Sequence, residues 1–78
     1  MRFFNTIYDE EPLITIRQTF STLPGITEPN IIPSLITNNL DLTETYKWLG
    51  WAQMNNPDVT VDLSTITPIF DIDFVARY

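Results

Sequence analysis

The sequence predicts a small α+β domain in which one helix packs on one face of an antiparallel sheet, in the order β-β-α-β-β. Three observations lead to this fold class. The N-terminal and C-terminal segments alternate apolar and polar residues with a period of two, which is typical of half-buried strands. Residues 42–55 instead carry apolar residues at helical spacing. Six prolines divide the rest of the chain into short pieces and disfavour a helical bundle.

The first two strands are predicted at residues 2–8 and 13–20. Aromatic and β-branched residues dominate the first, and the second shows clear apolar–polar alternation. Between them, residues 9–12 are three acids followed by a proline, which interrupts regular strand pairing. We therefore expect an N-terminal hairpin with a short acidic connection. Residues 21–33 are expected to form a proline-rich loop, and a short helical turn is expected to start near Pro33, in residues 33–39.

The predicted helix spans residues 42–55. Asp41 and Glu44, three positions apart, form a capping-box pattern at its start. Pro57 ends the helical pattern, because proline cannot continue a helix. Gly50 lies inside the segment and weakens a helix by about 1 kcal/mol relative to alanine.

Both tryptophans of the chain fall within this segment. On a helical wheel Trp48 borders the stripe that faces the sheet, whereas Trp51 lies on the opposite side, beside Glu44 and Lys47. Two interpretations of Trp51 remain open: it packs beneath the proline-rich loop, or it contacts a partner protein. We predict the second, because tryptophan is over-represented among the residues that dominate binding energy. The predicted protein-binding residues are Trp51, Trp48, Lys47 and Glu44.

Two more strands are predicted at residues 58–64 and 68–78, and the second has the strongest period-two pattern in the chain. The apolar faces of the sheet and helix together define the expected core. It consists of Ile14, Ile16, Phe20, Leu42, Tyr46, Leu49, Val61, Phe70, Ile72 and Phe74.

The residue types present disfavour catalysis. The chain has no cysteine and no histidine, which removes disulfides, thiolate zinc sites and the commonest general base. Asp71 and Asp73 lie two apart on a predicted strand and would need a third oxygen ligand, from Asp58 or Asp62, to hold Mg²⁺ or Ca²⁺. We interpret them as a solvated strand face. The sequence thus predicts no enzyme activity, no cofactor and no metal site.

Charge and length point to protein partners. Ten acidic residues against four basic ones give a net charge of −6, which disfavours binding to nucleic acid or to an anionic membrane. No apolar run approaches the roughly 18 residues of a membrane span, and the N-terminal residues lack a signal-peptide pattern, so cytoplasmic synthesis is expected. A single domain over residues 1–78 buries a small core, and without disulfides or metal its remaining source of stability is association.

These observations predict a non-enzymatic subunit that binds other proteins, as a homo-oligomer or a hetero-oligomer. A small structural component of a bacteriophage virion, of the decoration, connector or baseplate class, fits the short chain and its low charge density. The alternative is an acidic inhibitor that mimics nucleic acid and blocks a nuclease or restriction-type enzyme. That alternative requires a row of carboxylates spaced like phosphates, whereas the acids here are scattered along the chain.

Overall fold

The computed structural model describes residues 1–31, 33, 35–39, 42–46 and 48–78, and for residues 35–39 and 42–46 the description is confined to the backbone. The described chain consists of strands, loops and one turn of 3₁₀ helix, and it contains no α-helix. The elements are β1 (Arg2–Phe4), β2 (Ile14–Thr15), β3 (Leu35–Asn39), β4 (Leu42–Tyr46), β5 (Gly50–Gln53), β6 (Asn56–Val61), η1 (Leu63–Thr65) and β7 (Asp73–Arg77).

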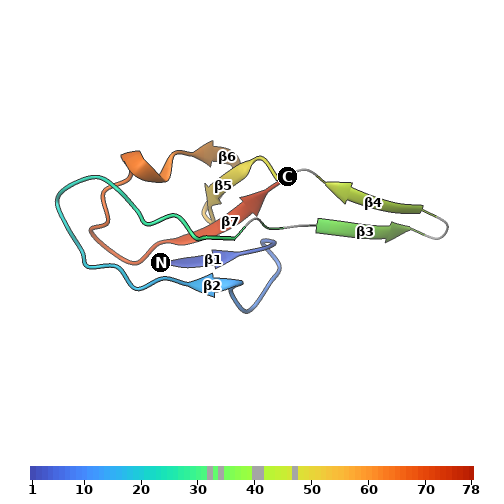
Figure 1. Ribbon diagram of the computed structural model, residues 1–78, viewed down its shortest axis with the longest axis horizontal. Coiled ribbons are helices and arrows are strands. Elements are labelled where there is room, and N and C mark those ends of the chain that lie inside the picture. The colour runs from blue at the N-terminus through green and yellow to red at the C-terminus, as the bar shows by residue number, and fades with distance from the viewer. Residues whose placement is uncertain (32, 34, 40–41, 47) are drawn as a thin grey trace.

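Five strands form one mixed sheet in the order β2-β1-β7-β5-β6. The strand nearest the C-terminus, β7, is therefore central, with β1 on one side and β5 on the other (Figure 1). Strand β1 runs parallel to β7, with Phe3 opposite Phe74, and the other neighbouring pairs are antiparallel. The predicted purely antiparallel sheet is wrong for this reason.

The predicted helix is also wrong: its residues include the whole of β4 and of β5. Two physical features favour strands here. Thr43, Thr45 and Tyr46 are β-branched or aromatic, and β3 supplies them with an antiparallel partner strand. Gly50 has a φ of +138°, a backbone conformation that no helix contains and that side chains rarely adopt. The helical turn predicted near Pro33 is replaced by β3, which begins at Leu35.

Strands β3 and β4 form a separate two-stranded sheet that projects from one end of the molecule, and we call it the arm (Figure 1). Its register runs from the Leu35–Tyr46 pair at the base to the Asn39–Leu42 pair near the tip. The arm makes the molecule long, with principal extents of 50 × 22 × 20 Å. The radius of gyration is 13.6 Å, whereas a compact chain of this length has about 11.5 Å.

Aromatic rings form the centre of the larger core, on the sheet face covered by the loops and η1. The Phe3 ring stacks on Phe74, with centroids 5.1 Å apart, and meets the edge of Trp51 at 5.0 Å. All three side chains are almost completely buried. The buried members of this cluster are Met1, Phe3, Ile26, Trp51, Leu63, Ile72, Phe74 and Ala76.

The opposite sheet face has a smaller buried cluster of Phe4, Ala52 and Val75. Polar side chains lie across the same strands. Arg2 donates two hydrogen bonds to the carboxylate of Asp73, at 2.8 and 2.6 Å, and its guanidinium lies 5.4 Å from the centroid of the Phe4 ring. Side chains of the last strand alternate between the two faces of the sheet, as predicted. Both faces of β7 are buried, however, because the strand is central.

The predicted strand bounds and core require further corrections. The hairpin of β1 and β2 exists, but its strands are shorter than predicted and the loop between them is longer. Ile72 and Phe74 are buried, and Ile14, Ile16 and Val61 are half-buried against the core. Phe20, Leu49 and Phe70 are more than half exposed, since all three lie outside the described strands; Leu49 was expected on the sheet-facing side of the predicted helix, and the other two on strand faces. For Leu42 and Tyr46 the structure describes the backbone alone, so their predicted place in the core lies outside what it describes.

Replacing Gly50 with alanine should destabilise the fold. A Cβ at this position would lie 2.9 Å from Cγ2 of Thr60, in addition to the backbone strain at positive φ. We expect a loss of about 1–3 kcal/mol in the free energy of unfolding, measured by urea denaturation. Gly25→Ala is a matched control, because φ there is +131° but a Cβ would meet no atom within 4 Å. Adding Thr60→Ser should recover part of the Gly50→Ala loss, and no recovery would contradict the proposed clash.

Phe3→Ala should cost about 3–5 kcal/mol, since it opens a cavity between two aromatic rings. Phe70→Ala should change stability by no more than about 0.5 kcal/mol, because the Phe70 side chain is 56% exposed. The measurement is the free energy of unfolding of each variant, taken from chemical denaturation curves whose slopes should be equal. Equal losses for the two variants would contradict the core described here.

Candidate functional site

The structure reverses the predicted orientation of Trp51. Its side chain is 2% exposed and packs inside the larger core. The reason is the change from helix to strand. Trp51 lies in β5 opposite Val61 on one side and Ala76 on the other, and its ring faces the loop-covered side of the sheet. A side chain this deeply buried does not anchor a partner in the folded chain, so the predicted partner-facing orientation is wrong.

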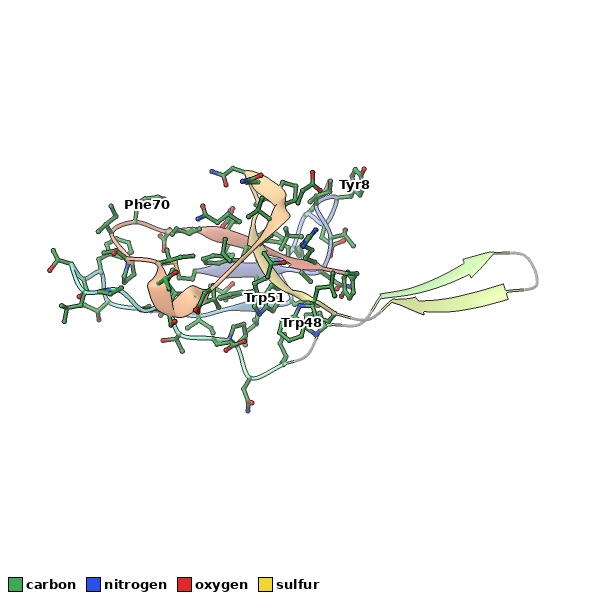
Figure 2. The ribbon with its side chains drawn as sticks, turned by 90° about the horizontal axis from the view of Figure 1, so that it is seen from above. Tyr8, Trp48, Trp51 and Phe70 are labelled. Atoms are coloured by element: carbon green, nitrogen blue, oxygen red, sulfur yellow. The ribbon has the colours of Figure 1, made fainter. Side chains whose placement is uncertain are left out.

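Of the four predicted binding residues, the structure brings two together. Trp48 is half-buried just before β5, and its ring meets Trp51 edge to face, with centroids 5.7 Å apart and planes at 69° (Figure 2). Lys47 lies outside the described residues. Glu44 belongs to β4, where only the backbone is described. The role predicted for Trp48 in partner binding stays a prediction.

Trp48 stands between two hollows at the base of the arm. One, of about 440 Å³, lies beside the start of β5, the end of β6 and η1, and both tryptophans line it together with Ile26, Glu28 and Asp62. The other, of about 410 Å³, is lined by Trp48 and by residues 28–31. Because Trp48 and Glu28 line both hollows, we treat them as one feature, the Trp48 groove.

Long-range hydrogen bonds place Glu28 in this groove. The amide of Gln18 donates to the Gly25 carbonyl at 2.7 Å and accepts from the Thr27 N–H at 2.8 Å, and so fixes the loop. The Ile26 N–H donates to the Leu63 carbonyl at 2.9 Å, which holds the same loop against η1. The segment before Glu28 is therefore fixed beside the segment that carries Asp62.

Asp62 caps η1 and adds negative charge to the groove. Its Oδ1 accepts hydrogen bonds from the Ser64 backbone N–H at 3.0 Å and from the Ser64 hydroxyl at 2.7 Å. These bonds favour the ionised form and hold the pKa of Asp62 below its usual value. Both bonds end on Oδ1, so Oδ2 faces no donor within the described chain.

Two of the described cations make contacts with other residues. Arg2 pairs with Asp73, and Arg77 donates to the Thr60 hydroxyl at 3.0 Å. Within the described ranges, Glu28 and Asp62 form no ion pair. The groove thus combines two carboxylates with an aromatic wall.

Each tryptophan also has a buried indole N–H without an acceptor in the part of the chain that the structure describes. An indole N–H is only a donor, and leaving it unpaired in the interior costs about 1–3 kcal/mol. Buried donors without a partner are rare in folded proteins, so both call for an explanation.

Asp71 and Asp73, which were considered as metal ligands, lie beside positively charged groups of the chain. Asp73 holds Arg2 through both carboxylate oxygens, and Asp71 lies 3.5 Å from the N-terminal nitrogen of Met1. Across the described ranges, no group of three or more acidic side chains is placed to hold a metal ion. None of the described segments is a helix long and apolar enough to cross a membrane.

No known family, curated protein or solved structure shows significant similarity to this chain. Its function is therefore inferred from the geometry of the groove and the arm. Sequence reasoning found Trp48 but missed Glu28, which lies in a loop without a local motif. Asp62 had a usable signal, because Asp is one of the residues preferred at a helix N-cap.

The cap that Asp62 forms on η1 predicts how the stability of the fold depends on pH. Because the pKa of Asp62 is lower in the folded chain than its usual 3.8, its carboxylate stabilises the fold above pH 3.8, and this contribution is lost as pH falls through the lowered value. Asp62→Ala should therefore lower the melting temperature at pH 7, and the difference from the parent chain should shrink as the pH falls below 3.8 and through the lowered pKa of Asp62. Asp58→Ala, an exposed acid on β6, serves as the control. A difference that stays constant with pH would show that the charge of Asp62 is irrelevant.

Proposed function

We propose that the chain is a non-enzymatic, protein-binding subunit of a larger assembly, and that the arm is the element that reaches its partner. The observation that carries this proposal is the projection of β3 and β4 from the five-stranded sheet, as a hairpin that pairs only with itself among the described strands (Figure 1). An isolated two-stranded hairpin is at best marginally stable in water. Contact with another protein supplies the missing stabilisation.

The backbone of the arm favours strand addition as the binding mode. Strands β3 and β4 pair with each other over five residue pairs, and each has an outer edge that pairs with no other described strand. Such an edge presents N–H and C=O groups at regular spacing and is a template for an added strand. A partner strand would extend this two-stranded sheet to three strands.

Charge supports a protein partner over other classes. A net charge of −6 disfavours nucleic acid and anionic membrane surfaces. The acidic inhibitor is the weaker alternative, because Asp73 is paired with Arg2 and Asp62 caps η1, so these carboxylates already act within the fold. Incorporation into a bacteriophage virion remains the specific form of the proposal and rests on chain length and composition.

Site-specific photo-cross-linking in the native source tests this proposal. A photoreactive amino acid at position 38, on β3, should give one recurrent covalent adduct, identified by mass spectrometry. An adduct of twice the chain mass would indicate a homo-oligomer, and any other mass a hetero-oligomer. Thr37→Pro should reduce the adduct yield at least about tenfold, because proline disrupts the arm ladder.

The control is the same photoreactive group at position 70, an exposed site outside the strands. Adducts from position 38 that survive Thr37→Pro, or a chain that purifies as a monomer with no adduct from position 38, would overturn the proposal.

A further inference from the structure

We infer that the Trp48 groove binds an arginine side chain carried by an extended segment of the partner protein. This inference rests on the proposed function and deepens it, since it adds a recognition site at the base of the arm. Three features of the groove carry it: an aromatic wall, two carboxylates that pair with no described cation, and the indole donor of the half-buried Trp48, which lacks a described acceptor.

The aromatic wall is Trp48. Its ring is half-buried, borders both hollows, and is supported from behind by the fully buried Trp51. Tryptophan is the best aromatic partner for a cation, and a guanidinium can stack on its face. A rigidly supported ring loses little freedom when a ligand binds, and this favours affinity.

The carboxylates set the charge of the ligand. Glu28 and Asp62 line the larger hollow, and no described cation pairs with either of them. The Oδ2 atom of Asp62 is open to a further donor, because Ser64 uses only Oδ1. A planar guanidinium donates several hydrogen bonds in fixed directions and stays charged at all physiological pH values. An anionic ligand would be repelled by the same two groups.

The Trp48 indole donor favours a peptide segment over a free cation as the ligand. Its N–H needs an acceptor, which a guanidinium does not have, whereas the side chain of Trp51 is only 2% exposed and is closed to a ligand. A backbone carbonyl of an extended segment supplies the acceptor once Trp48 takes up the ligand, and the arginine side chain of the same segment supplies the cation. The size of the larger hollow, about 440 Å³, is suited to one such side chain with its flanking backbone.

The test uses the full chain and the peptide acetyl-Thr-Val-Arg-Val-Thr-amide. Because the chain has two tryptophans, its ¹H–¹⁵N spectrum contains two indole resonances, and Trp48→Phe assigns them. We expect the peptide to shift both indole signals in a saturable manner. A peptide with citrulline in place of arginine keeps the shape but lacks the charge, and it should bind at least about fivefold more weakly.

Charge-removing variants locate the contact. Glu28→Gln and Asp62→Asn should each weaken binding of the arginine peptide about threefold or more, and Asp62→Asn retains an oxygen for the cap on Ser64. Glu10→Gln removes an exposed acid outside the groove and should leave the affinity unchanged. Unchanged dispersion of the amide resonances verifies that each variant is folded.

Three outcomes would overturn the inference: no indole shift at millimolar peptide, equal affinity for the arginine and citrulline peptides, or equal effects of Glu10→Gln and Glu28→Gln. These outcomes are distinguishable from failure of the proposed function. If position 38 gives an adduct but the indoles never respond, the arm binds a partner and the groove does not take arginine. If the adduct is also missing, the proposed function fails as well.

Discussion

The fold depends on the packing of Phe3 between Trp51 and Phe74. These three rings come from β1, β5 and β7, so two aromatic contacts made by Phe3 join the beginning, the middle and the end of the chain. The same series of rings continues outward from Trp51 to Trp48, which forms the wall of the groove (Figure 2). The core and the proposed binding site are therefore packed continuously against each other. A substitution at Phe3 should alter the packing of the Trp48 ring.

The sequence is most informative where apolar and polar residues alternate strictly along a strand. In the last strand Phe74 and Ala76 face the larger core as the period of two predicts. Residues 42–55 mislead because a short apolar pattern fits both a helix and a strand, and tertiary contacts choose between them. The partner strand β3 and the backbone of Gly50 favour strands. The parallel pairing of β1 with β7 has no local signal, since it joins residues about 70 positions apart.

The candidate site is predictable in part. Two tryptophans close together in a small chain point to the right region, but the helical wheel places Trp51 on the wrong side. On a strand, the ring of Trp51 turns inward and Trp48 remains at the border. The acidic members of the groove are beyond sequence reasoning, because the loop that carries Glu28 is held by hydrogen bonds from Gln18 and to Leu63. Such contacts follow from the completed fold.

The parallel pairing of β1 and β7 also has a mechanical consequence. Because the two strands are neighbours and point the same way, tension applied at Met1 and Tyr78 pulls them in opposite directions along their length. The hydrogen bonds between them are then sheared together, and they cannot open one after another as in a hairpin pulled from its ends. A chain with this topology therefore resists stretching between residues 1 and 78, because all the β1–β7 hydrogen bonds must break at once.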